Sequence, residues 1–278
     1  MLTEKEIETI IADEQVGTDS DDVTSLQPKD SLSTVLWEDS NLKDGLRNVL
    51  YRIALEYYLT LNVEAPVKDI IITGSLANYN YTDHSDVDLH ILLDYRQVDE
   101  DFDLVQDYMN AKKSVWNDKH DIRIKGHDVE LYSQDVNEPH HSTGTYSIMK
   151  DSWVDTPKPQ SANIDFGAVR QKALGLMKQI DDVLSEESPS PKRIDSLKVK
   201  IRKMRQSGLE TSGEYSVENL AFKVLRNTEY IKRLYDRAVE EFDKSLSIEN
   251  EELSENRIAY SSVLDRLLGA SKKWKNMK

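Results

Sequence analysis

The chain has 278 residues, no cysteine and a formal net charge of −15 at pH 7. This length favours two domains with cores of their own, and without cysteine the chain has no disulfide, zinc–thiolate site or thiol nucleophile. The acidic balance excludes a surface that binds nucleic acid throughout. The sequence has no run of about 18 apolar residues and no secretory signal, so we expect a cytoplasmic protein without a membrane partner.

The acidic residues are concentrated near the amino terminus. Residues 1–30 contain nine acidic side chains and two lysines, a net charge of −7. Isoleucines at helical spacing predict a short amphipathic helix over 3–13, and residues 14–32, rich in Asp, Ser and Thr, are typical of a solvated linker. We therefore expect residues 1–32 to form an acidic arm.

Residues 33–160 combine the patterns of helices and strands. Apolar side chains recur at helical spacing in some segments, whereas β-branched or alternating runs predict strands in others. The expected elements are a helix over 41–62, strands over 68–73 and 86–93, a helix over 99–117, and a hairpin around Lys125-Gly126. Looser structure is expected over 136–162, with a domain boundary near 157–162.

Residues 161–278 show only helical patterns. The expected helices span 163–186, 190–206, 216–246 and 250–271, with Pro189 and Pro191 at the first junction and Gly208 and Gly213 at the second. The predicted fold class is therefore α+β, with a mixed β-sheet core and its helices followed by an all-helical carboxy-terminal domain.

Gly74-Ser75 directly follows the predicted strand 68–73. Glycine lets the chain turn sharply and brings backbone N–H groups close to an anion. The Ser75 hydroxyl adds a donor for a phosphate group. This turn is our first candidate for nucleotide binding.

Asp86 and Asp88 stand two apart at the start of the next strand, so both carboxylates share one face. Paired carboxylates repel each other unless a cation lies between them, and their oxygens suit Mg²⁺ or Mn²⁺. An Asp-x-Asp pair alone is more often a solvated turn, but Gly74-Ser75 upstream and an acid downstream favour function. A calcium loop is excluded because the chain continues directly into Leu-His-Ile-Leu-Leu.

A third acid lies in the apolar strand that follows Gly126. Glu130 points away from its neighbours Val129 and Leu131, and Asp128 has the same parity as Glu130 and is the competing assignment. His90 shares a face with the first two acids and is a further candidate to line the site.

These residues predict a two-metal phosphoryl-transfer site. Asp86 and Asp88 would bind both ions, and Glu130 would bind the ion that activates the attacking hydroxyl and help to remove its proton. Gly74 and Ser75 would hold the triphosphate. Asp86, Asp88 and Glu130 are therefore both the catalytic and the metal-binding candidates.

The order of these motifs resembles the polymerase-beta-like nucleotidyltransferase superfamily. The matching elements are Gly74-Ser75, the gap 76–85, Asp86-Val87-Asp88-Leu89 and Val129-Glu130-Leu131. Thr82 and Ser85 fit the Gly-Ser…Thr…Ser-Asp-x-Asp form of many members, which adds Ser85 to the nucleotide-binding candidates. The third acid is Glu where Asp is commoner in the superfamily. The resemblance covers about residues 41–135.

The resemblance implies transfer of a nucleoside monophosphate from an NTP to an acceptor hydroxyl, with release of pyrophosphate. The acceptor stays open between an RNA 3′ end, a protein, a small molecule and a second nucleotide. Residues 142–154 and 213–227 also resemble phage-encoded predicted nucleotidyltransferases, which would place the protein in the cytoplasm of a phage host. The alternative is a catalytically weak protein of the same fold that serves as a binding or virion-associated module.

Residues 189–206 contain seven basic side chains and one acid. Lys198, Arg202 and Arg205 lie at helical spacing on one stripe. The resemblance implies that Lys198 and Arg202 could close over the triphosphate, with Lys223 and Arg226 as weaker candidates. An ordinary solvated helix face is the other interpretation.

Overall fold

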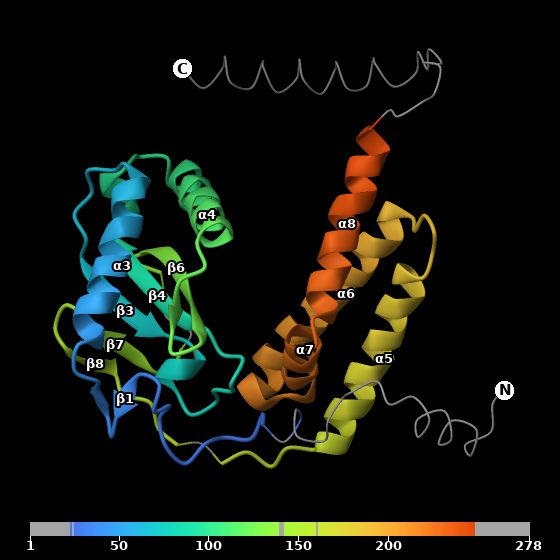
Figure 1. Ribbon diagram of the computed structural model, residues 1–278, viewed down its shortest axis with the longest axis horizontal. Helices are drawn as coiled ribbons and strands as arrows, with labels where there is room; N and C mark the ends of the chain where they lie inside the picture. The colour runs from blue at the N-terminus through green and yellow to red at the C-terminus, as the bar shows by residue number, and fades with distance from the viewer. Residues whose placement is uncertain (1–22, 24, 139–141, 160, 248–278) are drawn as a thin grey trace.

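The computed structural model describes residues 23, 25–138, 142–159 and 161–247. The predicted helices 3–13 and 250–271 lie outside these residues. Two hydrophobic cores organise the described chain. Figure 1 shows the two corresponding halves, the sheet with its helices on the left and a group of helices alone on the right. The first is built from residues between Leu32 and Ile148, and the second from residues between Val169 and Leu234 together with Val23 and Leu26. The end of the predicted linker therefore packs against the helices.

A mixed sheet of six strands forms the centre of the first half. Its strand order is β5-β6-β4-β3-β7-β8, and only β4 and β6 run parallel to each other. The strands are β3 (Asp69–Thr73), β4 (Val87–Leu93), β5 (Arg123–Ile124), β6 (His127–Asp135), β7 (Thr145–Ser147) and β8 (Ser152–Asp155). The short strands β1 (Trp37–Glu38) and β2 (Asn41–Leu42) pair separately.

The alternation of side chains along β4 gives the sheet two different faces. Val87, Leu89, Ile91 and Leu93 are fully buried against helix α3 (Leu46–Leu61), whereas Asp88 and its face-mates are only partly buried. Helix α4 (Phe102–Lys119) packs along β6, where the Asn117 side chain bonds both the N–H and the carbonyl of Leu131. The apolar face thus forms the core, and the polar face remains accessible.

Most predicted elements of this half are confirmed, with two differences. Residues 41–42 form β2, and α3 begins only after Gly45, whose φ is +82°. The segment 136–162 contains β7 and β8, which the sequence did not predict. These strands have three and four residues, too few for a periodic pattern, and they form by pairing in the sheet, β7 with β3 and β8 with β7.

The second half consists of helices α5 (Phe166–Leu184), α6 (Pro191–Ser212), α7 (Val217–Asn227) and α8 (Tyr230–Leu246). The predicted α+β class, a mixed sheet followed by helices, is confirmed. None of the helices in the described ranges is long and apolar enough to cross a membrane.

Two helix boundaries differ from the prediction. Gly208 lies inside α6 and not at its end, at a place where a Cβ atom would collide with Ser216 and Glu218 next to α7. The predicted helix 216–246 is broken into α7 and α8 at Glu229, whose φ is +61°.

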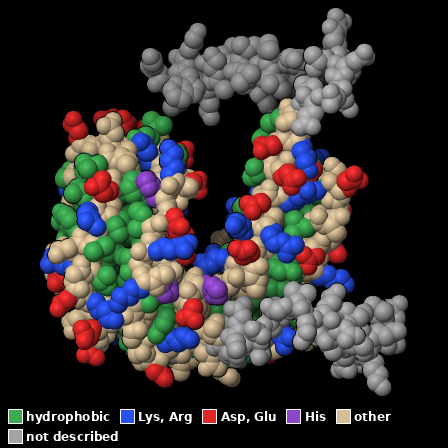
Figure 2. Space-filling view, in the orientation of Figure 1, with side chains coloured by type: hydrophobic (Ala, Val, Ile, Leu, Met, Phe, Trp, Pro, Cys, Tyr) green, Lys and Arg blue, Asp and Glu red, His purple; other side chains and the backbone are tan. Residues whose placement is uncertain are grey.

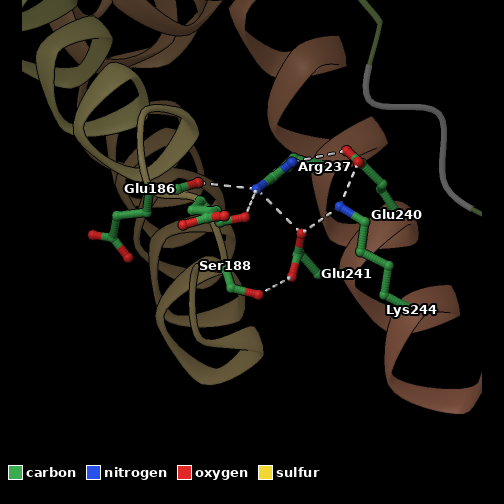
Figure 3. A network of polar contacts seen from close by, with 7 residues as sticks. Glu186, Ser188, Arg237, Glu240, Glu241 and Lys244 are labelled. Carbon is green, nitrogen blue, oxygen red and sulfur yellow. Dashed lines mark hydrogen bonds and ion pairs between the residues drawn. The ribbon is translucent and has the colours of Figure 1, made fainter. Parts of the chain in front are cut away.

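A partly buried ion-pair network joins α8 to the loop between α5 and α6 (Figure 3). Arg237 donates to the carbonyls of Glu186 and Glu187 at 3.0 and 2.9 Å, and its guanidinium lies 3.2 Å from the Glu241 carboxylate. The Glu241 side chain is only 6% exposed, and its Oε1 atom also lies 3.2 Å from Lys244 Nζ. Because a buried carboxylate without a partner is costly, Arg237 is required to hold α8 in place.

The Arg237→Met substitution should therefore lower the free energy of unfolding by about 2–3 kcal/mol. This is less than the cost of a buried carboxylate without any partner, because Lys244 still contacts Glu241. Arg233→Met, one turn earlier on α8, is the matched control. Arg233 pairs with Asp181 at 3.5 Å with both side chains 48% exposed, so its loss should cost less than about 1 kcal/mol. Equal effects of the two variants in urea unfolding would contradict the structural role of Arg237.

Candidate active site

The turn after β3 is shaped by its contact with β4. Gly74 has φ +75° and ψ −161°, a conformation that is essentially restricted to glycine. A Cβ atom at Gly74 would overlap the carboxylate of Asp88, which pairs with Thr73 across the two strands. The turn therefore lies directly over an acid of the predicted site, and only glycine fits there.

Two serines tie this turn to the loop that precedes β4. The Ser75 hydroxyl donates to Ser85 Oγ at 2.8 Å, and Ser85 Oγ also accepts from the backbone N–H of Thr82 at 2.9 Å. His127 Nδ1 donates to the Ser85 carbonyl at 2.6 Å. These bonds join β3, β4 and β6 at the point where Asp86 enters the site.

The structure brings Asp86, Asp88 and Glu130 together on the polar face of the sheet. Asp88 and Glu130 are direct partners in the parallel pairing of β4 with β6, and Asp86 precedes Asp88 on the same face. The rival acid Asp128 is exposed and lies 2.7 Å from Arg123 in an ion pair. The strand register thus places Glu130, and not Asp128, opposite Asp88.

The pKa values of Asp86 and Asp88 are both raised. Burial is the largest cause that raises the pKa of Asp88 to about 7, and the charges of Glu130 and Asp86 add to it. Burial and Glu130 also raise the pKa of Asp86, against the opposing effect of Arg226. Such a concentration of carboxylates favours a bound cation, because a positive charge would stabilise the ionised forms.

Two of the three carboxylates have other partners in this structure. Arg226 Nη1 lies 4.0 Å from Asp86 Oδ2, and the Tyr132 hydroxyl donates to Glu130 Oε2. Within the described ranges, no group of three His, Asp or Glu side chains is arranged to bind a metal ion as the side chains stand. The oxygen donors suit Mg²⁺ or Mn²⁺, but their convergence requires side-chain rotation.

Cations from α7 approach the acids from the helical half. Arg226 faces Asp86, and one turn earlier Lys223 Nζ lies 3.5 Å from the Asn80 carbonyl in the loop before β4. Burial lowers the pKa of Lys223 to about 8, with Glu214 opposing this effect and Arg226 and Arg205 adding to it. The Asn80 side chain also donates to Glu214. Helix α7 is thus joined to the loop that carries Asp86.

Lys198 and Arg202, predicted to bind the nucleotide, are not brought to the acids. Lys198 Nζ lies over the ring of Tyr235 on α8, 4.5 Å from its centroid, and 3.8 Å from Asp195. Arg202 is exposed and has no hydrogen bond or ion pair among the described residues. The reason is the packing of α6, which contacts α8 at Lys198 and α7 at Arg205. The cation that lies beside the acids is Arg226 of α7.

Sequence reasoning missed most of a polar cluster next to the acids. His90 and Tyr132 are partners across β4 and β6 and stack with ring centroids 4.6 Å apart. Lys113 Nζ lies 4.0 Å from the centroid of the Tyr132 ring, and His90 Nδ1 donates to Gln134 at 2.8 Å. Burial and Glu130 raise the pKa of Tyr132 far above its ordinary value, so its hydroxyl remains a donor. The even spacing of residues 130, 132 and 134, which places them on one face of a strand, could have predicted this cluster.

Comparisons with known proteins do not establish a family. No protein-family model matches the chain, and no curated protein matches it. Among solved structures, the chain is similar to a STING-associated CdnE c-di-GMP synthase from Capnocytophaga granulosa, with 12% identity over 86% of this chain and 92% of that chain. The TM-score is 0.21, which is too low to establish a common fold.

The Gly74→Ala substitution should destabilise the protein by about 2–3 kcal/mol, because it combines backbone strain with displacement of Asp88. Gly213→Ala is a closely matched control. Gly213 has φ +73° and ψ −159°, and a Cβ there meets nothing within 4 Å. That variant should lose only the strain, about 1 kcal/mol. If urea unfolding gives the same loss for both variants, Gly74 does not constrain Asp88.

Removing the charge of Asp88 should stabilise the metal-free protein. Its raised pKa means that the folded state binds the proton more tightly than the unfolded state, so stability falls as pH rises from the ordinary pKa of 3.8 to about 7 and stays at this lower level above 7. In EDTA at pH 8, Asp88→Asn should be more stable than the wild type by about 2 kcal/mol. The gain should shrink as pH falls below 7.

Asp128→Asn provides the control, because Asp128 is exposed and paired with Arg123. It should give no gain in stability. Thermal unfolding of both variants between pH 5 and pH 8 measures the difference. A gain from Asp88→Asn that is constant over this range would contradict the assignment of the raised pKa.

Proposed function

We propose that this protein is a metal-dependent nucleotidyltransferase, which moves a nucleoside monophosphate from an NTP to an acceptor hydroxyl and releases pyrophosphate. The supporting observation is the position of Asp88 and Glu130 on the paired strands β4 and β6, with Asp86 directly before β4 and the Gly74-Ser75 turn over Asp88. Three neighbouring carboxylates repel one another and are stabilised by a positive charge between them. The negative charge of a polyphosphate is neutralised by the same kind of ion. A divalent cation serves both requirements.

Asp86, Asp88 and Glu130 would hold Mg²⁺ or Mn²⁺. The bound ions would supply charge neutralisation at the phosphoryl oxygens and a lowered pKa of the acceptor hydroxyl. Glu130 would take the proton of that hydroxyl. The acceptor oxygen would then form a bond to the α-phosphorus of the NTP, while the bond from this phosphorus to the pyrophosphate oxygen breaks.

The triphosphate would lie between the Gly74-Ser75 turn and α7. Arg226 and Lys223 are the cations of the helical half that approach the loop carrying Asp86. When an NTP and its metal ions enter, Arg226 would exchange its contact with Asp86 for one with the phosphates. We propose Arg226 and Lys223, in place of Lys198 and Arg202, as the basic nucleotide-binding residues.

The second candidate is a protein of the same fold that binds a partner without efficient catalysis. The observation in its favour is that Arg226 and Tyr132 engage two of the acids, so that the described side chains form no ready metal site. A metal titration separates the two candidates. Absence of Mg²⁺ and Mn²⁺ binding, with stable co-purification of a partner, would favour the binding module.

The enzymatic proposal predicts Mg²⁺-dependent release of pyrophosphate from an NTP. Asp86→Asn and Asp88→Asn should each reduce the rate at least about 100-fold, because each removes a charged ligand of the metal. Asp128→Asn should retain activity, since its carboxylate pairs with Arg123. The assay uses each of the four labelled NTPs, alone and with cell lysate, so that the labelled product identifies the acceptor. Equal rates for the wild type and both site variants would overturn the proposal.

A further inference from the structure

Helix α8 exposes a stripe of large apolar side chains. Tyr235, Val239, Phe242 and Leu246 are 47%, 60%, 59% and 68% exposed. They recur at intervals of four, three and four residues, which places them along one side of the helix. Single exposed apolar side chains are ordinary, but a contiguous row of them marks an interaction surface.

A groove between α6 and α8 adjoins this stripe. It is lined by apolar and charged side chains of both helices, namely Pro191, Ile194, Asp195, Lys198, Ala238, Val239 and Phe242. Because Val239 and Phe242 belong to both the stripe and the groove, the two features form one continuous surface, which we call the α8 surface.

Two acids beside the stripe have no cationic partner. Asp236 and Asp243 directly follow Tyr235 and Phe242, and both are exposed. Within the described ranges, neither side chain forms an ion pair or a hydrogen bond. By contrast, Glu240 on the same helix pairs with cations of α8. The α8 surface therefore suits a partner that combines an apolar face with basic side chains.

The sequence that follows α8 has both properties. Helix α8 ends at Leu246, the last residue of the stripe, and the chain continues to residue 278. Tyr260, Val263, Leu267 and Ala270 recur at intervals of three and four residues, which predicts a helix with one narrow apolar face. Residues 257–278 also contain two arginines and four lysines but a single acid.

The length of this sequence fits the stripe. The stripe extends about 17 Å along α8, and a helix over 257–271 would extend about 21 Å at 1.5 Å per residue. Residues 247–256 are mostly polar, as is typical of a connection between two helices. The segment can therefore reverse direction after α8 and return along it.

We propose that residues 257–271 pack as a helix on the α8 surface of the same chain, antiparallel to α8. Charge favours this occupant over a second copy of the protein. Another α8 would bring further carboxylates towards Asp236 and Asp243, whereas residues 257–278 bring a net positive charge. The covalent connection also gives the segment a high effective concentration at this surface. The inference does not depend on the nucleotidyltransferase proposal.

The test is the reactivity of a single thiol placed on the α8 surface. The full chain has no cysteine, so Val239→Cys provides the only thiol, and its reaction with a chromogenic disulfide reagent is followed by absorbance. Adding Val263→Asp and Leu267→Asp should accelerate this reaction at least about 10-fold, because two apolar contacts are lost and two charges oppose docking.

Three controls accompany this measurement. Ser261→Asp with Ser262→Asp adds the same charge away from the predicted apolar face and should leave the rate unchanged. Ser207→Cys on α6 is exposed and sets the rate of a free thiol. Val224→Cys, at a site only 3% exposed, should stay protected in both Asp backgrounds, which shows that the helices remain folded.

The segment docks if Val239→Cys reacts at least about 10-fold more slowly than Ser207→Cys and loses this protection only with the Val263→Asp and Leu267→Asp pair. Equal rates of Val239→Cys and Ser207→Cys would overturn the inference. Protection that survives the Asp pair, or that disappears on dilution of the protein, would also overturn it, because another segment or a second copy would then cover the surface.

Discussion

The parallel pairing of β4 with β6 is the constraint on which the rest of the site depends. It places Asp88 opposite Glu130, and His90 opposite Tyr132, on one face of the sheet. A shift of this register by one residue would move Glu130 to the apolar face and Val129 to the polar one. The register is maintained because Val87, Leu89, Val129 and Leu131 are all buried on the opposite face. The hydrophobic core of the first half thereby determines the geometry of its acids.

The acids repel one another electrostatically, and side chains of neighbouring elements reduce this repulsion in part. Arg226 approaches Asp86 from α7, and Tyr132 donates to Glu130 from within the sheet. Asp88 lies under the Gly74 turn with a pKa raised to about 7, mainly by burial. A site with this much unneutralised charge is expected where a cation binds, because stability alone would favour fewer carboxylates.

The two halves meet at the loop that leads into β4. This loop contributes Asn80 to the contacts with Lys223 and Glu214, and Asp86 to the contact with Arg226. Figure 2 shows the molecule hollowed between the two halves, with Lys and Arg side chains on both sides of the hollow. A ligand that bound to the acids would therefore also meet cations of the helical half.

The sequence by itself determined the α+β class, the long helices, β3, β4 and the hairpin around Gly126, because their side-chain periodicity is strong and local. It also pointed to Gly74, which directly follows a strand, and to Asp86, Asp88 and Glu130, since strand parity decides which side chains share a face. Parity left Asp128 open as a rival of Glu130. Only the tertiary structure decided which strands are neighbours, and hence that Glu130 and not Asp128 lies opposite Asp88 and that Tyr132 contacts Glu130. It likewise placed Arg226 beside the acids and Lys198 against Tyr235. The direction of a helix's charged face depends on how that helix packs against others, which helical spacing does not specify.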